Sequence, residues 1–423
     1  MPHSRQSVAL FAALFALAAC GADEPAGPLT LDALPALTAT EEARWGDADD
    51  PALGFTFITS VDLDRDGNVY VFEASVPEIR VYDPSGARIG TIGRRGEGPG
   101  EFSGPARFEV MGDSIWTFES SGTRMTLFDR EGEVLSTGVA ERVQVMLPNA
   151  IGTMLPREPD AEGLFIGWFS RLSSSRESSG VEPTDALPWP LVRFRADGSV
   201  ADTLGWLPKP PPRMWRPPSE APPGIEVLSI GERPFMVPRA NILLPEWIML
   251  GTERIEVVAP APTGPDATVA LTRITLEGDT VYESSLALPS MRYTAAMLDS
   301  LALDAAATGG FGMRIGGPAP EAVDNVDEVA ARLRAEMDFP EFVTPLNYSR
   351  VGEDDSVWMR LHGDDGAGNA VWVIMEGDGR FRGRLALPPR VEPRWMSGDT
   401  VWAAATDDLD IPWLVRYRLS GDG

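Results

Sequence analysis

The most constraining feature of the sequence is a short motif that occurs six times, at intervals above forty residues. In each copy a large apolar residue stands four positions before a glycine that has an acidic or small polar neighbour. The six pairs are Tyr82/Gly86, Phe128/Gly132, Phe194/Gly198, Ile274/Gly278, Met375/Gly379 and Tyr417/Gly421. Polarity alternates around each glycine, which is typical of two strands joined by a tight turn. Six hairpins at variable spacing predict an all-β, six-bladed β-propeller, because each blade is one small antiparallel sheet.

A second motif precedes four of these hairpins. It combines a polar residue, a β-branched residue and an aromatic residue: Asn68-Val69-Tyr70, Ser114-Ile115-Trp116, Ser356-Val357-Trp358 and Thr400-Val401-Trp402. Each copy follows an Asp/Gly pair or a pair of acids, so it predicts a turn and then a strand. This strand and the hairpin supply three strands of one blade, and an innermost strand is expected just upstream.

The N-terminus has the pattern of a bacterial lipoprotein signal. Arg5 precedes an apolar run from Val8 to Ala19, which is too short to span a bilayer and suits a secretory signal. The run ends in Leu-Ala-Ala before Cys20, which resembles the lipobox, and Cys20 is the only cysteine. We therefore expect residues 1–19 to be a signal peptide and Cys20 to be acylated and inserted in a lipid bilayer. An ordinary signal peptide with a coincidental cysteine remains the alternative.

Residues 20–28 are small, polar and proline-bearing, as expected of a flexible tether between a lipid and a domain. Gly21, directly after the cysteine, resembles the outer-membrane sorting pattern of diderm bacteria. The expected location is therefore the cell envelope, with a lipid anchor.

The chain is strongly acidic, with 36 basic and 63 acidic residues and a formal net charge of −27. Nucleic acid is an unsuitable partner for such a chain, because phosphate binding depends on clustered positive charge. A single cysteine cannot form an intramolecular disulfide, so the fold must depend on its hydrophobic core.

Residues 64–102 carry the most specific pattern, which includes Gly96 and the run Gly98-Pro99-Gly100-Glu101-Phe102. This stretch resembles an NHL-repeat blade followed by the junction to the next blade. The chain is thus similar to NHL-repeat-like six-bladed β-propeller lipoproteins of environmental bacteria. The resemblance is tight over residues 55–138, loosens in the third and fourth blades, and returns from Tyr348 onward.

The propeller is expected to occupy residues 29–423, with approximate blades at 55–93, 106–138, 143–206, 235–289, 346–388 and 393–420. The last blade ends after its third strand, which would leave an unpaired edge. The stretch from Leu29 to Trp45 is the expected fourth strand, and its pairing with the last blade would close the ring.

Two insertions interrupt the blades. The first, at 207–234, contains the proline-rich run from Pro208 to Gly224, which we interpret as an extended loop. The second, at 290–345, has apolar residues at helical spacing and predicts two short helices that cap one face of the propeller. The second helix is expected to begin near Pro320, because proline is favoured at the first helical position.

Three aspartates, Asp62, Asp64 and Asp66, precede Gly67 and match the start of an EF-hand loop, with Glu73 at its twelfth position. The intervening residues read as an extended strand, which would carry Glu73 away from any ion. A tight Asp-Gly turn is the favoured interpretation. A weak Ca²⁺ site formed by the three aspartates is the alternative, and no other cofactor is predicted.

Histidine is nearly absent: His3 lies in the signal, and His362 lies in a segment that reads as a polar hairpin loop. A catalytic triad or a multi-histidine metal site is therefore strongly restricted.

Three arginines remain as candidate ligand-binding residues: Arg107, Arg350 and Arg394, in the expected innermost strands of the second, fifth and sixth blades. If they face the channel, they would form a positive site for a carboxylate or a similar anion. Because a register slip of one residue reverses each side chain, the alternative is that they pair with acids between blades.

The leading functional hypothesis is a non-enzymatic scaffold in the cell envelope that binds a small anionic ligand or an envelope protein. The alternative is a metal-dependent hydrolase or lyase of the lactonase-like propeller type, which would use a carboxylate Ca²⁺ site.

Overall fold

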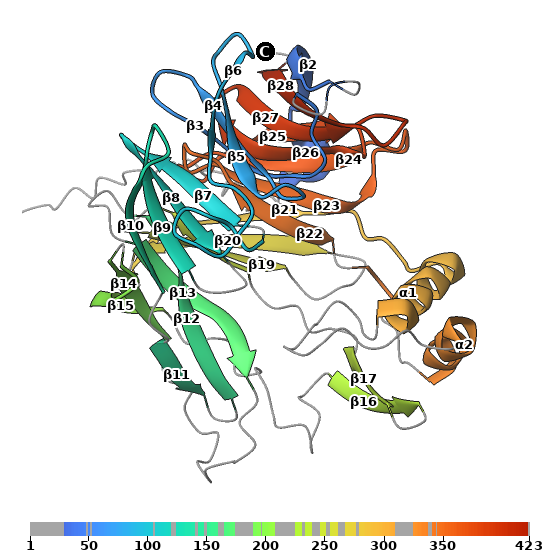
Figure 1. Ribbon diagram of the computed structural model, residues 1–423. Coiled ribbons are helices and arrows are strands. Elements are labelled where there is room, and N and C mark those ends of the chain that lie inside the picture. The colour runs from blue at the N-terminus through green and yellow to red at the C-terminus, as the bar shows by residue number, and fades with distance from the viewer. Residues whose placement is uncertain are drawn as a thin grey trace, which may run out of the picture.

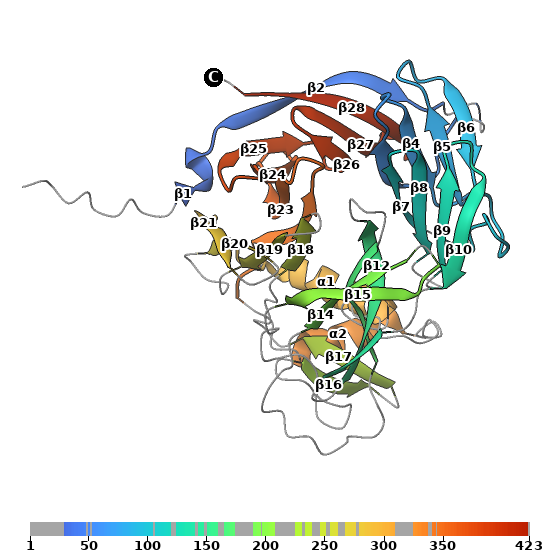
Figure 2. The same cartoon turned by 90° about the vertical axis from the view of Figure 1, so that its left-hand side faces the viewer.

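The computed structural model describes residues 29–47, 50, 53–104, 106–119, 124–139, 143–147, 150–159, 165–173, 189–195, 197–207, 225–230, 233–238, 246–250, 254–260, 267–275, 279–308, 325–336, 341–343 and 345–421. Small antiparallel sheets follow one another around a ring (Figures 1 and 2). The predicted signal peptide, Cys20, the tether and the proline-rich run 208–224 lie outside the described residues.

The first two blades are four-stranded antiparallel sheets in chain order. Blade 1 contains β3 (Ile58–Leu63), β4 (Val69–Glu73), β5 (Glu78–Tyr82) and β6 (Arg88–Ile92). Blade 2 contains β7 (Ala106–Met111), β8 (Ser114–Glu119), β9 (Arg124–Asp129) and β10 (Val134–Val139).

Blades 3 and 4 each have more strands than the minimal blade. Blade 3 contains β11 (Val143–Leu147), β12 (Ala150–Pro159), β13 (Phe165–Ser173), β14 (Trp189–Phe194) and β15 (Val200–Leu207). Blade 4 contains β18 (Glu246–Leu250), β19 (Arg254–Pro260), β20 (Thr268–Thr275) and β21 (Thr280–Ala287), and the short β1 (Leu29–Thr30) pairs in parallel with β21. A short 3-10 helix, η1 (Leu31–Ala33), follows β1.

The structure differs from the sequence interpretation between blades 3 and 4. Two strands, β16 (Ile225–Ile230) and β17 (Arg233–Pro238), form a separate two-stranded sheet. Blade 4 was expected to begin near residue 235, but its first strand is β18, at 246–250. Residues 235–238, the expected start of blade 4, do lie in a strand, but the sequence of one strand does not reveal which sheet it joins.

Blades 5 and 6 share an N-terminal strand. Blade 5 contains β22 (Leu346–Val351), β23 (Val357–Asp364), β24 (Ala370–Met375) and β25 (Phe381–Leu387), and blade 6 contains β26 (Val391–Ser397), β27 (Thr400–Thr406) and β28 (Pro412–Gly421). The strand β2 (Ala36–Trp45) pairs antiparallel with β28, from Leu37/Gly421 to Trp45/Leu414. It also pairs briefly with β25. The prediction that an N-terminal strand closes the last blade is confirmed, and Figure 2 shows β2, β28, β27 and β26 in order from the outside inwards.

The repeated hairpin glycines pack against the neighbouring blade. Gly86 has φ +91°, a conformation that favours glycine, and a Cβ added to it would lie 2.6 Å from Nε1 of Trp45 on β2. Gly379 has φ +87°, and its Cβ would lie 2.8 Å from the ring of Tyr282 in blade 4. In blade 2 the Cβ of Gly132 would lie 3.3 Å from Ile92 of blade 1. Each of these turns therefore requires glycine for its backbone, and at Gly86 and Gly379 also for contact with the preceding blade.

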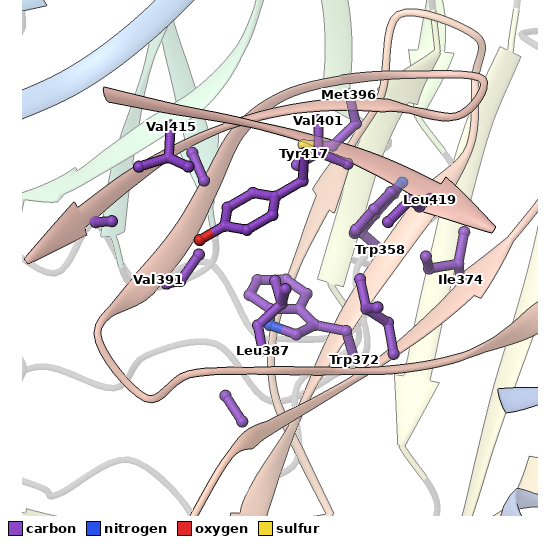
Figure 3. Close-up of a cluster of buried hydrophobic side chains, with 14 residues drawn as sticks. Trp358, Trp372, Ile374, Leu387, Val391, Met396, Val401, Val415, Tyr417 and Leu419 are labelled. Atoms are coloured by element: carbon purple, nitrogen blue, oxygen red, sulfur yellow. The ribbon is translucent and has the colours of Figure 1, made fainter. Parts of the chain in front are cut away.

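The aromatic residues of the second sequence motif are buried, each in a different hydrophobic cluster. Tyr70, Trp116, Trp358 and Trp402 are each at most 2% exposed. Figure 3 shows Trp358 and Trp372 of blade 5 facing Tyr417 and Val401 of blade 6. Full burial of one large apolar side chain contributes about 1.5–3 kcal/mol, so these inter-blade contacts hold the sheets together.

The insertion between blades 4 and 5 contains two helices, α1 (Ala295–Thr308) and α2 (Val326–Glu336), which pack against each other (Figure 1). The insertion is closed at its base, where Tyr293 N donates to Glu341 O and Val343 N to Met291 O. Pro320, near which the second helix was expected to begin, lies outside the described residues. The structure has α2 beginning at Val326, and the carbonyl of Asn325 accepts its first helical hydrogen bond from Val329. Neither of these described helices is long and apolar enough to cross a membrane.

Candidate functional site

The three candidate arginines lie on the first strands of their blades. Arg107 is on β7, Arg350 on β22 and Arg394 on β26. First strands of neighbouring blades contact one another in the pairs β18/β22, β26/β3 and β3/β7. These strands therefore form the inner side of the ring, as the sequence predicted (Figure 2).

Glu392, on β26, is the centre of a polar cluster between blades 5 and 6. The hydroxyl of Tyr348 donates a hydrogen bond to its Oε2. Arg360 Nη1 donates to Oε1 at 3.2 Å, and Arg350 Nη2 lies 3.9 Å from Oε2. The guanidinium of Arg350 also lies over the Tyr348 ring, 5.3 Å from the ring centroid. One carboxylate is thus shared by two guanidinium groups and a phenol.

Arg394 lies next to this group, at a register shift between Pro393 and Trp395. Such an irregularity can re-aim the side chains beside it, and the pairing of β26 with β27 resumes at Trp395. Burial lowers the pKa of Arg394, and the positive charge of Arg350 lowers it further, whereas the charge of Glu392 acts in the opposite direction. The structure therefore brings Arg350 and Arg394 close enough to repel each other.

The cluster has unused hydrogen-bond donors. The Nε atoms of Arg350, Arg360 and Arg394 are buried and have no hydrogen-bond partner among the described residues. A buried donor without a partner costs about 1–3 kcal/mol, so three of them in one place are unfavourable unless something else binds there. We call these three arginines, together with Glu392 and Tyr348, the arginine cluster.

Arg107 is not joined to the arginine cluster. It is exposed on β7, and it forms no ion pair or hydrogen bond with the described residues. The structure thus unites two of the three arginines selected from the sequence.

The sequence interpretation missed Arg360, Glu392 and Tyr348. Arg360 lies on β23, between the buried residues Met359 and Leu361. A charge that follows three apolar residues and precedes a fourth within one strand is a signal that could have identified it, because a charge among buried residues needs a partner. Glu392 had no such signal, since its contacts come from two other strands.

Asp62 occupies a different polar site on the inner strands, between blades 1, 2 and 6. Its side chain accepts hydrogen bonds from Val110 N at 2.6 Å and from its neighbour Leu63 N at 2.7 Å. The indole of Trp395, on β26, donates a further hydrogen bond. Asp62 is 7% exposed. Burial raises the pKa of Asp62 to about 7, with a smaller contribution from the charge of Glu353, while the hydrogen bonds oppose this shift.

Asp64 closes the tight turn between β3 and β4. Its Oδ1 accepts from Asp66 N and Asn68 N, both at 2.9 Å, and its Oδ2 accepts from Asn68 Nδ2. Gly67, with φ +83°, donates its N–H to the carbonyl of Asp64. This is the Asp-Gly turn that the sequence favoured over a cation loop.

The three aspartates do not share one set of hydrogen-bond partners, although Arg130 Nη1 lies 3.7 Å from Asp64 Oδ2 and 2.9 Å from Asp66 Oδ2. Asp66 is exposed and accepts a hydrogen bond from Arg130 at 2.9 Å, whereas Asp62 binds the neighbouring blades. Glu73 accepts from Thr56 N and Phe57 N in the loop before β3. Within the described ranges, no group of three or more His, Cys, Asp or Glu side chains is arranged to hold a metal ion.

His362 is exposed, as expected, but it lies on β23 rather than in a hairpin loop. The strand continues to Asp364, and the turn follows it, with Asp365 N donating to Asn369 O.

Comparisons with known proteins do not assign the chain to a family. No protein-family model matches the chain, and no curated protein matches it. Among solved structures, it is similar to a DUF4221 family member from Bacteroides vulgatus, with a TM-score of 0.47, 9% identity and coverage of 91% of this chain and 99% of that one.

It is also similar to virginiamycin B lyase from Staphylococcus aureus, with a TM-score of 0.33, 10% identity and coverage of 90% and 98% of the two chains. For the calcium-binding protein regucalcin from Agrobacterium tumefaciens, the TM-score is 0.33, with 10% identity and coverage of 91% and 96%. Similarity at this level carries no information about ligand or activity.

Proposed function

We propose that the protein is an NHL-repeat-like lipoprotein of the cell envelope, whose propeller binds a small anionic ligand at the arginine cluster without catalysing a reaction. The proposal has two parts, an anchor and a binding site, and each can be tested without the other.

The binding part rests on one observation: the buried Nε atoms of Arg350 and Arg394 have no hydrogen-bond partner among the described residues. Guanidinium groups are strong donors to carboxylates and other oxyanions. Their positions on β22 and β26, at the inner side of the ring, are those at which propellers and barrels present side chains to ligands. An anion would satisfy the donors and reduce the repulsion between the two arginines.

The binding experiment is a thermal melt of the purified protein with a panel of small carboxylates. A ligand that binds only the folded state raises the melting temperature by mass action. We expect at least one carboxylate to raise the melting temperature of the wild type, and Arg350→Ala to abolish this shift while changing the unliganded melt little.

The matched control is Arg380→Ala. Arg380 is in the exposed hairpin of the same blade, where it pairs with Glu376 and Asp378. It should keep the full ligand response. If no anion stabilises the wild type, or if Arg350→Ala is unfolded, the arginines are structural and the binding proposal fails.

The anchoring part rests on the sequence before Cys20, which resembles a lipobox, and on the absence of any other cysteine. We expect wild-type protein to enter the detergent phase and Cys20→Ser to remain in the aqueous phase or to accumulate uncleaved. Equal partitioning of the two proteins would contradict lipidation and leave the binding site untouched.

A further inference from the structure

The arginine cluster has more positive charge than its own carboxylate balances. Arg350 and Arg360 both interact with Glu392, and Arg394 feels the charge of both Arg350 and Glu392. Among the described residues, Glu392 is the only acid that pairs with Arg350 or Arg360. Three guanidinium groups around one carboxylate leave two positive charges uncompensated, which favours a ligand with two negative charges.

Glu392 satisfies only part of the donor capacity of the arginine cluster. Glu392 accepts from Tyr348 and Arg360 and lies near Arg350, so its carboxylate satisfies terminal nitrogens but leaves the three Nε atoms unbound. An arginine usually binds an oxyanion through two parallel N–H donors. Glu392 therefore resembles a partial substitute for a ligand oxyanion and competes with it for the same guanidinium groups.

We propose that the arginine cluster binds a small, doubly charged oxyanion, and that Glu392 competes with it. This inference depends on the proposed anion-binding function and adds two specific claims: Arg360 is a ligand-binding residue, and two negative charges are required. Dicarboxylates and tetrahedral dianions such as sulfate share this chemistry, so the experiment includes both.

The first experiment compares succinate, sulfate and acetate at constant ionic strength and at pH 8, with titration calorimetry on the purified full-length protein. We expect succinate or sulfate to bind at least tenfold more tightly than acetate. Tighter binding of succinate would identify a dicarboxylate, and tighter binding of sulfate a tetrahedral dianion. If acetate binds as tightly as both dianions, the charge requirement is wrong although anion binding stands. If none of the three binds, the proposed function itself fails.

The second experiment tests Arg360. Arg360→Gln should weaken binding of the preferred dianion at least tenfold, because it removes one of the two uncompensated charges. Arg360→Lys keeps the charge but cannot present two parallel N–H donors to one oxyanion, so it should weaken binding less than Arg360→Gln. Arg380→Gln is the surface control and should bind like the wild type. Unchanged dianion affinity in a folded Arg360→Gln variant would exclude Arg360 from the site.

The third experiment tests the competition by Glu392. Glu392→Gln removes the internal carboxylate, keeps the side-chain size and adds one uncompensated positive charge. We expect it to bind the dianion several-fold more tightly than the wild type, and acetate more tightly as well. Equal or weaker binding by a folded Glu392→Gln variant would show that Glu392 organises the arginines and does not compete with the ligand. This result would overturn the competition claim.

Discussion

Two polar sites on the inner strands differ in how completely their hydrogen bonds are satisfied. Asp62 is buried among donors from three blades: Val110 of blade 2, Trp395 of blade 6 and its own neighbour Leu63. The arginine cluster between blades 5 and 6 has three buried Nε donors without partners in the described part of the chain. A satisfied buried network stabilises the fold, whereas an unsatisfied one costs stability. The first site therefore stabilises the fold, and the second is the site at which we propose that an anion binds.

The largest expected effect is the loss of stability when Asp62 is replaced. Asp62→Ala leaves the partly buried N–H groups of Val110 and Trp395 without the acceptor that Asp62 provides, and we expect it to lower the free energy of unfolding by about 2–4 kcal/mol at pH 6. Chemical denaturation monitored by tryptophan fluorescence measures this loss. Asp66→Ala is the control, since Asp66 has a 63% exposed side chain, and it should cost less than about 1 kcal/mol. If both variants lose the same free energy of unfolding, Asp62 does not have a special structural role.

The second prediction concerns pH. The pKa of Asp62 is raised to about 7 in the folded protein, well above that of an aspartate in an unfolded chain. The folded state therefore holds this proton more tightly than the unfolded state, so the contribution to stability is present at low pH and is lost as the pH rises through 7. Between pH 5 and pH 8 we expect Asp62 to reduce the free energy of unfolding by about 1–3 kcal/mol.

Asp62→Asn isolates this contribution, because the amide does not titrate. Melting temperatures at pH 5 and pH 8 should differ less in Asp62→Asn than in the wild type, although the rest of the acidic surface titrates in both. A variant with the same pH dependence as the wild type would mean that Asp62 is ionised throughout this range.

A smaller effect is expected inside the arginine cluster. Tyr348→Phe removes the hydroxyl that donates to Glu392 and should lower the free energy of unfolding by about 0.5–1.5 kcal/mol. It should also alter anion binding, because Glu392 loses one of its two hydrogen bonds within the cluster. If neither stability nor binding changes, Tyr348 and Glu392 do not interact in solution.

The smallest effect on stability is expected for Arg394. Burial and the charge of Arg350 both lower its pKa, so the charged form is disfavoured where it lies. Arg394→Gln should therefore raise or lower the free energy of unfolding by less than about 1 kcal/mol. The anion response should nevertheless fall. If Arg394→Gln lowers the free energy of unfolding as much as Asp62→Ala does, Arg394 has a structural role and the two sites do not differ in the way described.

The sequence was sufficient for the blade pattern because each repeat carries local signals. Gly86 and Gly379 were predicted as turn residues, and both have the positive φ that such turns require. Their second role, contact with Trp45 and Tyr282 of the preceding blades, depends on how sheets pack and has no local signal. The same limit explains why the separate sheet of β16 and β17 was not predicted.

The polar sites show where prediction from sequence ends. Asp64 was interpretable because its partners, Asp66 and Asn68, are four residues away at most. Asp62 binds Val110 and Trp395 from other blades, so its role depends on strand register across the ring. Arg350 and Arg394 were selected correctly as inner-strand residues, but their meeting at Glu392 is a tertiary contact that spacing does not encode.

The pairing of β2 with β28 fixes the order in which the protein can be completed. Leu37 pairs with Gly421, so the first long strand to be synthesised has to wait for the last strand before its backbone groups find their partners. Closing so large a loop is entropically costly and slow, and the open edges of both strands are exposed in the meantime. Without β28, β2 keeps only its short pairing with β25 at Ala36 and Leu37, and most of its backbone groups lack partners. The ring is then open at blade 6, so the last strand of the propeller supplies the backbone partners that its first long strand needs.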